Sequence, residues 1–187
     1  LAGGTHHARA DQGAGYCVFN DCAVGARLVQ REGGVQRVLI VDTDVHQWDG
    51  TAAIFAGDPS VFTFSIHGAQ NFPSTKATSD LDLALPSGTG DGDYLEQFAA
   101  GLAKAFACSD PQFVFFLSGA DPHEGDRLGR LRISKGGLEQ RDRMVFLACR
   151  QRGLRVATVM GGGYGKNIAD TVDVYEAHGP DAEGAAA

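Results

Sequence analysis

The sequence lacks the segments that would mark a membrane protein, a secreted precursor or a broad nucleic-acid binder. None of its hydrophobic runs approaches the length of a membrane span, and residues 1–7 lack both the basic and the long apolar segment of a signal peptide. Lys and Arg number 16 against 23 Asp and Glu, which gives a formal net charge of −7 with no basic block. Because binding along a nucleic acid needs such a block, we expect neither a nucleic acid nor a membrane as partner.

Cysteine and methionine are also scarce. The four cysteines are Cys17, Cys22, Cys108 and Cys149. No two of them are spaced as Cys-x-x-Cys, which argues against a structural zinc site or a thioredoxin-like centre. We therefore expect the cysteines to be reduced and buried as small apolar side chains, and the protein to be cytoplasmic. The two methionines are Met144 and Met160, and a dense motif already begins at Gly3, so we interpret the chain as lacking an N-terminal portion.

Short apolar runs alternate with stretches of helical periodicity along the 187 residues. The apolar runs occupy residues 37–42, 112–118 and 154–160. The helical stretches occupy residues 20–30, 93–106, 135–151 and 166–175. Runs this short and this apolar predict strands buried on both faces, which is typical of a parallel sheet. The alternation with helices predicts a single α/β domain with right-handed crossovers.

Polar residues cluster where the predicted strands end. Asp42, Asp44 and His46 follow the first strand, Asp121 the second and Tyr164 the third. Ligands of open parallel sheets bind at the carboxyl ends of the strands. Carboxylate and imidazole together suit zinc, and Asp121 could supply a third ligand while a fourth position stays open. The alternatives are a solvated acidic loop after the first strand and a helix-capping role for Asp121.

A histidine pair and a glycine-bound tyrosine are further candidates for chemistry. His6 and His7 could be metal ligands, a general acid/base pair or incidental surface residues. Asp42 and Asp49 are candidates to fix the tautomers of the two imidazoles. The glycines before Tyr164 lack the Lys-Ser/Thr ending of a phosphate-binding loop. They could form a flexible turn, or they could present the Tyr164 hydroxyl to a developing oxyanion.

Six motifs occur in the order seen in the zinc-dependent histone deacetylases, whose superfamily includes acetoin utilisation proteins and acetylpolyamine amidohydrolases. They are Gly3-Gly-Thr-His-His-Ala8, Gly13-Ala-Gly-Tyr-Cys-Val-Phe-Asn-Asp21, Asp42-Thr-Asp-Val-His46, Ser65-Ile-His67, Ser118-Gly-Ala-Asp121 and Gly161-Gly-Gly-Tyr164. Glu124-Gly-Asp-Arg-Leu-Gly129 and Leu131-Arg-Ile-Ser134 most resemble the class IV branch and its bacterial relatives. The resemblance implies an arginase-like three-layer α/β fold with a central parallel sheet whose N-terminal strands are missing here. It also implies a catalytic domain over residues 1–178 and a flexible tail over 179–187.

The resemblance implies a role for each conspicuous polar residue. The implied zinc ligands are Asp44, His46 and Asp121. The implied catalytic residues are His6, His7, Asp42, Asp49 and Tyr164, with the two aspartates orienting the two histidines and the tyrosine contacting the substrate carbonyl. The implied walls of a narrow acyl-lysine channel are Gly15, Tyr16, Phe72 and Leu128. A structural potassium ion is implied at Asp42, Asp44, His46, Ser65 and Ile66.

The activity implied is zinc-dependent removal of acetyl or longer acyl groups from lysine side chains of proteins or peptides. An acetylpolyamine or other small acylated amine is an alternative substrate, and a non-catalytic acyl-lysine-binding module is an alternative from another class. A binuclear ureohydrolase of the arginase type needs a second acid two residues after Asp121, which this chain lacks.

Trp48 departs from the family pattern, which usually has glycine at this position. If the backbone there requires a positive φ, tryptophan would be strained and Asp49 could be displaced from His7. The interpretation we favour is that Trp48 fits and changes only the mouth of the site.

Overall fold

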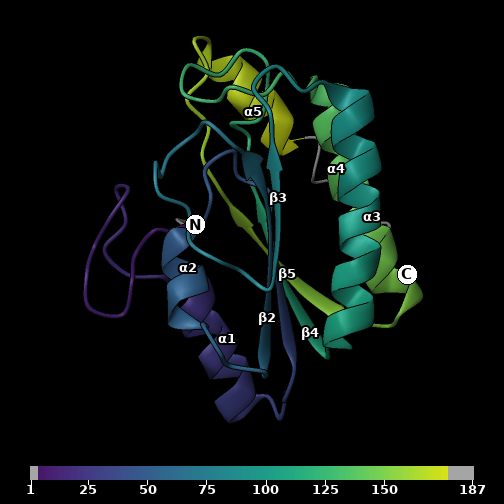
Figure 1. Ribbon diagram of the computed structural model, residues 1–187. Helices are drawn as coiled ribbons and strands as arrows, with labels where there is room; N and C mark the ends of the chain where they lie inside the picture. Colours follow the sequence, from purple (N-terminus) through teal and green to yellow (C-terminus); the bar gives the residue numbers. More distant parts are fainter. Residues whose placement is uncertain (1–3, 177–187) are drawn as a thin grey trace.

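The computed structural model describes residues 4–176 of the chain, so Gly3 and the predicted tail at 179–187 lie outside the described residues (Figure 1). In chain order the elements are α1 (Asp21–Glu32), β1 (Val38–Asp42), α2 (Asp49–Ile54), β2 (Val61–Gly68), β3 (Leu81–Leu85), α3 (Asp91–Ser109), β4 (Phe113–Ser118), α4 (Lys135–Gln151), β5 (Arg155–Met160) and α5 (Ile168–Glu176). Every predicted strand and helix is present, within two or three residues of its predicted ends. Three elements, namely β2, β3 and α2, are additional to those predicted from the sequence.

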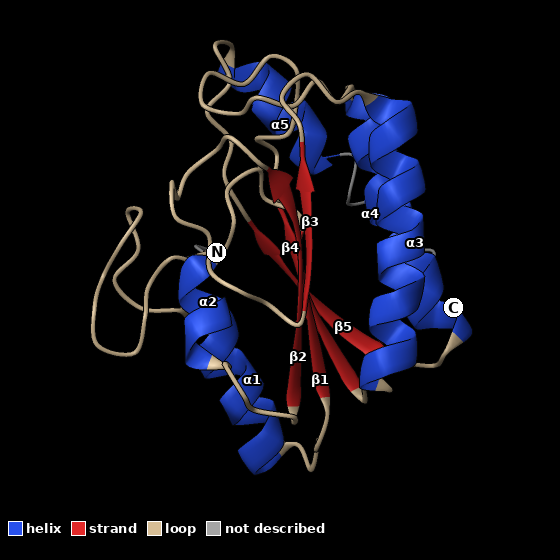
Figure 2. Ribbon diagram, in the orientation of Figure 1, coloured by secondary structure: helices blue, strands red, loops and turns tan. Residues whose placement is uncertain are grey.

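The five strands form one parallel sheet in the order β3-β2-β1-β4-β5. Helices α1 and α2 cover one face and α3 and α4 the other, so the molecule has three layers (Figure 2). Alternate side chains of β1 enter opposite cores. Leu39 and Val41 pack on the α3/α4 side, whereas Val38 and Ile40 pack on the α1/α2 side. The predicted α/β class with a central parallel sheet is confirmed.

Two expectations about burial need correction. Within the described residues β5 pairs with β4 alone, and its six residues are exposed or half-buried, whereas β1 is buried throughout. The prediction that 154–160 is buried on both faces is therefore wrong for this chain, because β5 forms a sheet edge. The expectation of buried cysteines holds for three of the four, but Cys108 is exposed on α3.

The strand register brings the functional loops to one edge of the sheet. Asp42 at the end of β1 pairs with Ser65 of β2 and Leu117 of β4, and Ser118 of β4 pairs with Met160 of β5. The loops after β1, β4 and β5 therefore leave the sheet side by side, at its carboxyl end. Of the helices described, none has both the length and the apolar character needed to cross a membrane.

Candidate active site

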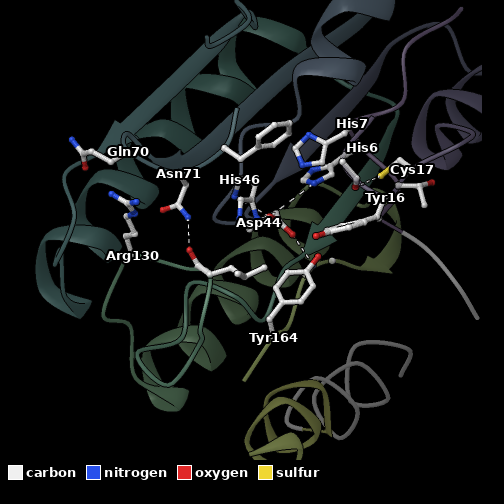
Figure 3. Close-up of a pocket in the computed structure, with 17 residues that line it drawn as sticks. His6, His7, Tyr16, Cys17, Asp44, His46, Gln70, Asn71, Arg130 and Tyr164 are labelled. Atoms are coloured by element: carbon white, nitrogen blue, oxygen red, sulfur yellow. Dashed lines mark hydrogen bonds and ion pairs between the residues drawn. The ribbon is translucent and has the colours of Figure 1, made fainter. Parts of the chain in front are cut away.

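The loops after β1 and β4 bring Asp44, His46 and Asp121 together. One ligand atom from each lies within 4.8 Å of the other two, a grouping able to hold a metal ion. His46 Nδ1 is 3.0 Å from Asp44 Oδ1 and 3.0 Å from Asp121 Oδ2. Both carboxylates are buried. The three predicted zinc ligands thus meet in one cluster, of which Asp44 and His46 line a cavity (Figure 3).

The buried cluster holds an excess of negative charge. Burial and the neighbouring Asp44 carboxylate raise the pKa of Asp121 to about 7. Burial alone would lower the pKa of His46, but its hydrogen bonds to Asp121 and Asp44 raise it to about 10. Protons on these groups offset the repulsion between the carboxylates, and a divalent cation would do so more strongly. Two carboxylates and one imidazole are donors that zinc accepts.

Backbone N–H groups fix the orientation of both carboxylates. Val45 N donates to Asp121 Oδ1 at 2.8 Å, and Gly162 N donates to Asp44 Oδ2 at 2.6 Å. The second bond requires the backbone after β5 to lie directly against the cluster. A Cβ at Gly162 would lie 2.1 Å from Asp121 Oδ2, so only glycine permits this approach.

His6 and His7 are buried beside the cluster, each paired with an aspartate. His6 Nδ1 is 2.6 Å from Asp42 Oδ2, and His7 Nδ1 is 2.7 Å from Asp49 Oδ1. Because each Nδ1 faces a carboxylate, each Nε2 is left to face the cavity, and His6 Nε2 is 3.9 Å from Asp44 Oδ1. The structure therefore brings together the partners expected from the sequence.

The two imidazoles have opposite pKa shifts. Burial opposes protonation of His6, yet the Asp42 and Asp44 carboxylates raise its pKa to about 9. Burial lowers the pKa of His7, with a smaller effect of the neighbouring His6, while Asp49 acts in the opposite direction. Near neutral pH the arrangement therefore favours a charged His6 and a neutral His7, and a neutral imidazole can accept a proton.

Two residues without a role predicted from the sequence, Asn20 and Asp21, hold the histidine segment in place. Asn20 Nδ2 donates to the carbonyls of His6 and Ala8 at 3.3 and 3.1 Å. Asp21 accepts hydrogen bonds from Gly4 N and Thr5 N at 2.8 and 3.0 Å. Both belong to the second family motif, but neither follows a predicted strand, the position that singled out the candidate metal ligands.

Gly15 allows the 13–17 turn to lie against a catalytic candidate. Its φ is +51°, and a Cβ there would lie 2.2 Å from His7 Cδ2. The imidazole of His7 therefore occupies the volume that any side chain at this position would need.

The cavity, of about 600 Å³, is lined by all four predicted channel residues, namely Gly15, Tyr16, Phe72 and Leu128. The Phe72 ring lies edge-on to His7 at 5.0 Å between centroids. Tyr16 is almost fully exposed, so it belongs to the mouth of the cavity rather than to a closed wall. The apolar lining beside the histidines suits a hydrocarbon chain.

Tyr164 faces the metal cluster from the opposite wall. Its ring lies 6.3 Å from His46 between centroids, and its hydroxyl points toward Asp44 in Figure 3. Asp126 Oδ2 accepts a hydrogen bond from Tyr164 N at 2.6 Å, a contact that the sequence analysis did not anticipate. Burial, followed by the Asp44 carboxylate, raises the pKa of Tyr164 to about 12. The hydroxyl therefore stays protonated and available as a donor.

Trp48 is accommodated without strain. Its φ is −76°, and the side chain is fully buried in the core between the sheet and α1/α2, with Nε1 donating to Ser79 Oγ at 3.1 Å. Asp49 keeps its bond to His7. The favoured interpretation is right about the fit but wrong about the mouth of the site, because Trp48 does not line the cavity.

The residues expected around a potassium ion are partly gathered. Asp42 and Ser65 are register partners on adjacent strands, and Ser65 Oγ lies 2.9 Å from His67 Nδ1. Ile66 packs in the core on the α3/α4 side. The potassium site stays a prediction.

Comparisons with known proteins agree with this geometry. A family model described as the histone deacetylase domain matches residues 1–177. An uncharacterised protein of Picosynechococcus sp. is 52% identical over 171 residues, which cover 91% of this chain and 57% of that protein. The acetoin utilization protein AcuC of Bacillus subtilis is 32% identical over 177 residues, which cover 88% of this chain and 46% of AcuC.

Among solved structures, the HDA15 HD domain matches this fold with a TM-score of 0.79 at 29% identity, over 95% of this chain and 54% of that one. The shared architecture confirms the predicted arginase-like three-layer fold. The chain spans about half the length of the relatives it matches.

Proposed function

The chain belongs to the histone deacetylase family, and from this premise we propose that it is the catalytic part of a zinc-dependent amidohydrolase that removes acyl groups from lysine side chains. The observation that carries the proposal is the convergence of two aspartate-backed histidines and a tyrosine hydroxyl on one ligand cluster in a single cavity. Amide hydrolysis needs an activated water, a proton donor for the leaving amine and stabilisation of the oxyanion.

Asp44, His46 and Asp121 would hold the zinc ion. Their fit rests on the donor set and on the unbalanced negative charge of the buried cluster. Bound there, zinc supplies a lowered pKa for the attacking water and polarisation of the acyl carbonyl.

His7 would act as the general base and then as the general acid. Asp49 keeps the Nδ1 proton of His7 in place, so its Nε2 can take a proton from the attacking water. As the carbon–nitrogen bond breaks, the same proton goes to the departing amine. His6, whose charged form Asp42 stabilises, would add positive charge beside the ligand cluster, where its Nε2 lies 3.9 Å from Asp44 Oδ1.

Tyr164 would donate a hydrogen bond to that oxygen. Its high pKa keeps the proton on the hydroxyl, and a donor aimed at developing charge acts most strongly in a cavity that excludes water. The walls formed by Gly15, Phe72 and Leu128 would position the aliphatic part of the acylated amine.

The test is metal-restored hydrolysis of acetyl- and long-chain acyl-lysine peptides, with an acetylated polyamine as a second substrate. We expect a chelator to stop the release of free amine and zinc to restore it. His7→Gln keeps a polar side chain of similar size and should abolish turnover while zinc binding persists. Binding of acyl-lysine peptide without any release of acid would refute the hydrolase and favour a binding module. Hydrolysis of the polyamine alone would replace lysine by a small amine as the substrate.

A further inference from the structure

We propose that Arg130 and Gln70 form an anion subsite at the mouth of this cavity, which selects acylated amines that carry a carboxylate. The proposal rests on the proposed function, because it names the substrate class for the same site. The lining of the cavity includes Gln70, Asn71 and Arg130 together with the catalytic candidates. In Figure 3 these three residues lie together on one side of the pocket, away from His6 and His7.

The charged lining residues differ between the two ends of the cavity. Among the described residues of the lining, Asp44 is the only carboxylate, and it belongs to the ligand cluster. Arg130 is the only Lys or Arg among them. The chain as a whole carries a net charge of −7, so an anion that enters this cavity depends on Arg130 for a nearby positive charge.

Arg130 has no anionic partner in residues 4–176. Its side chain is exposed and forms no ion pair there, whereas its neighbour Arg127 donates Nε to the Tyr164 carbonyl at 2.8 Å. A guanidinium without a partner at a cavity mouth can bind a carboxylate through two parallel N–H groups.

Gln70 is oriented so that its donor end is available. Ser87 N and Ser87 Oγ both donate to Gln70 Oε1, each at 2.9 Å. With the carbonyl end occupied, the Nε2 amide has no acceptor among the described residues and can donate to a ligand in the same cavity.

Hydrogen bonds between separate loops hold the backbone near Gln70 and at Arg130. Gly88 N donates to the Arg130 carbonyl at 2.8 Å, which ties Arg130 to the turn that also carries Ser87. Asn71 Nδ2 donates to the Leu128 carbonyl at 2.9 Å, which ties the Gln70 loop to the Arg130 loop. The subsite is therefore built on loops whose relative positions are fixed before a ligand arrives.

The chemistry that fits is a carboxylate at the far end of an acylated alkylamine. In an Nε-acyl-lysine the reacting amide and the α-carboxylate are separated by the aliphatic side chain, so one end can lie at His7 while the other meets Arg130. An acidic side chain beside an acyl-lysine in a peptide would present the same group. The two sources share one interaction and are separated by the choice of substrate.

The test compares carboxylates with their uncharged matches, using the zinc-loaded protein as its gene encodes it. One pair is Nε-acetyl-lysine and its carboxamide, and the other is an amide-capped acetyl-lysine peptide with Asp or Asn next to the lysine. We expect kcat/KM to favour one of the two acids about 5-fold or more, and the preference to shrink as salt is added. Arg130→Gln should remove the preference, measured as the ratio of kcat/KM between acid and uncharged match within each pair. Arg132→Gln, at an exposed neighbour outside the lining, should keep it.

A binding titration of the same four compounds gives a readout that does not need turnover. Equal kcat/KM and equal affinity within both pairs would overturn the subsite and leave the hydrolase intact. A preference that survives Arg130→Gln would overturn it as well. If none of the compounds is hydrolysed, the proposed function fails, and the affinities alone then support or overturn the anion subsite.

Discussion

Arg141 is a fully buried arginine on α4, and it forms hydrogen bonds to the start of the loop that carries Asp121. Its Nε donates to Asp142 Oδ1 at 2.7 Å, its Nη1 to the Gly119 carbonyl at 2.7 Å and its Nη2 to Ser118 Oγ at 2.8 Å. Both members of the Arg141–Asp142 pair are shielded from water. The loop that carries Asp121, a candidate zinc ligand, is therefore supported by a buried ion pair.

Replacing Arg141 by methionine keeps most of the side-chain volume and removes the charge. The Asp142 carboxylate then stays buried without this cation, and the Gly119 carbonyl loses its donor. Breaking a buried pair in this way costs about 3–5 kcal/mol of the free energy of unfolding. For a chain of this size the loss corresponds to a fall in Tm of about 10 °C.

Urea unfolding with and without zinc measures this loss. Zinc affinity, from competition with a chelator, should also fall by about 10-fold or more, because groups that orient a metal ligand tune its affinity. The matched control is Arg143→Met on the exposed face of the same helix, which should change stability by less than about 0.5 kcal/mol.

A double variant separates the charge from the packing. Arg141→Met combined with Asp142→Leu should be less destabilised than the sum of the two single variants by at least about 1 kcal/mol, since neither charge is then stranded. A loss below about 1 kcal/mol in Arg141→Met, or strict additivity in the double variant, would refute this reasoning.

Three further substitutions test other parts of the site. Tyr164→Phe should lower kcat about 10²-fold with little change in KM, and steady-state kinetics with unchanged turnover would contradict the role of the hydroxyl. Gly15→Ala should lower kcat at least about 10-fold, because its Cβ would enter the imidazole of His7; Gly34→Ala, which has a similar positive φ and no atom within 4 Å, should keep the activity. Trp48→Ala should cost about 3–5 kcal/mol in urea unfolding, and a rise in its turnover would instead revive the strain interpretation.

The elements predicted from the sequence are those whose patterns are strong. The run at 112–118 and the stretch at 135–151 are apolar or periodic over enough residues to identify a strand and a helix. β2 was missed because Thr63, Ser65 and His67 interrupt its apolar pattern, although all three are buried. Thr63 Oγ1 donates to Asp80 Oδ2 at 2.7 Å, and such partners, which make burial of polar groups tolerable, come from distant parts of the chain. α2 has only six residues, too few to show a period.

For the site too, the residues with a local pattern could be predicted from the sequence, whereas those that depend on distant contacts could not. Residue types that carry chemistry, such as Asp44, His46 and Asp121, stand out at strand ends, and their convergence follows from parallel topology. The role of Asp126, which fixes the Tyr164 backbone, depends on a contact across 38 positions that leaves no local pattern. The location of Trp48 was mistaken because proximity in sequence to Asp49 says little about which layer a side chain enters.

The position of each strand in the sheet also determines the order in which parts of the site unfold. β1 and β4, whose loops carry the zinc-ligand candidates, are paired on both sides, whereas β5, which leads into Tyr164, is half-exposed at an edge. Amide hydrogens of β1 should therefore exchange only through global opening, while those of β5 exchange through low-energy local fluctuations. If the proposed function holds, mild denaturant or heat would displace the Tyr164 hydroxyl before the ligand cluster opens, so inactivation would precede loss of zinc.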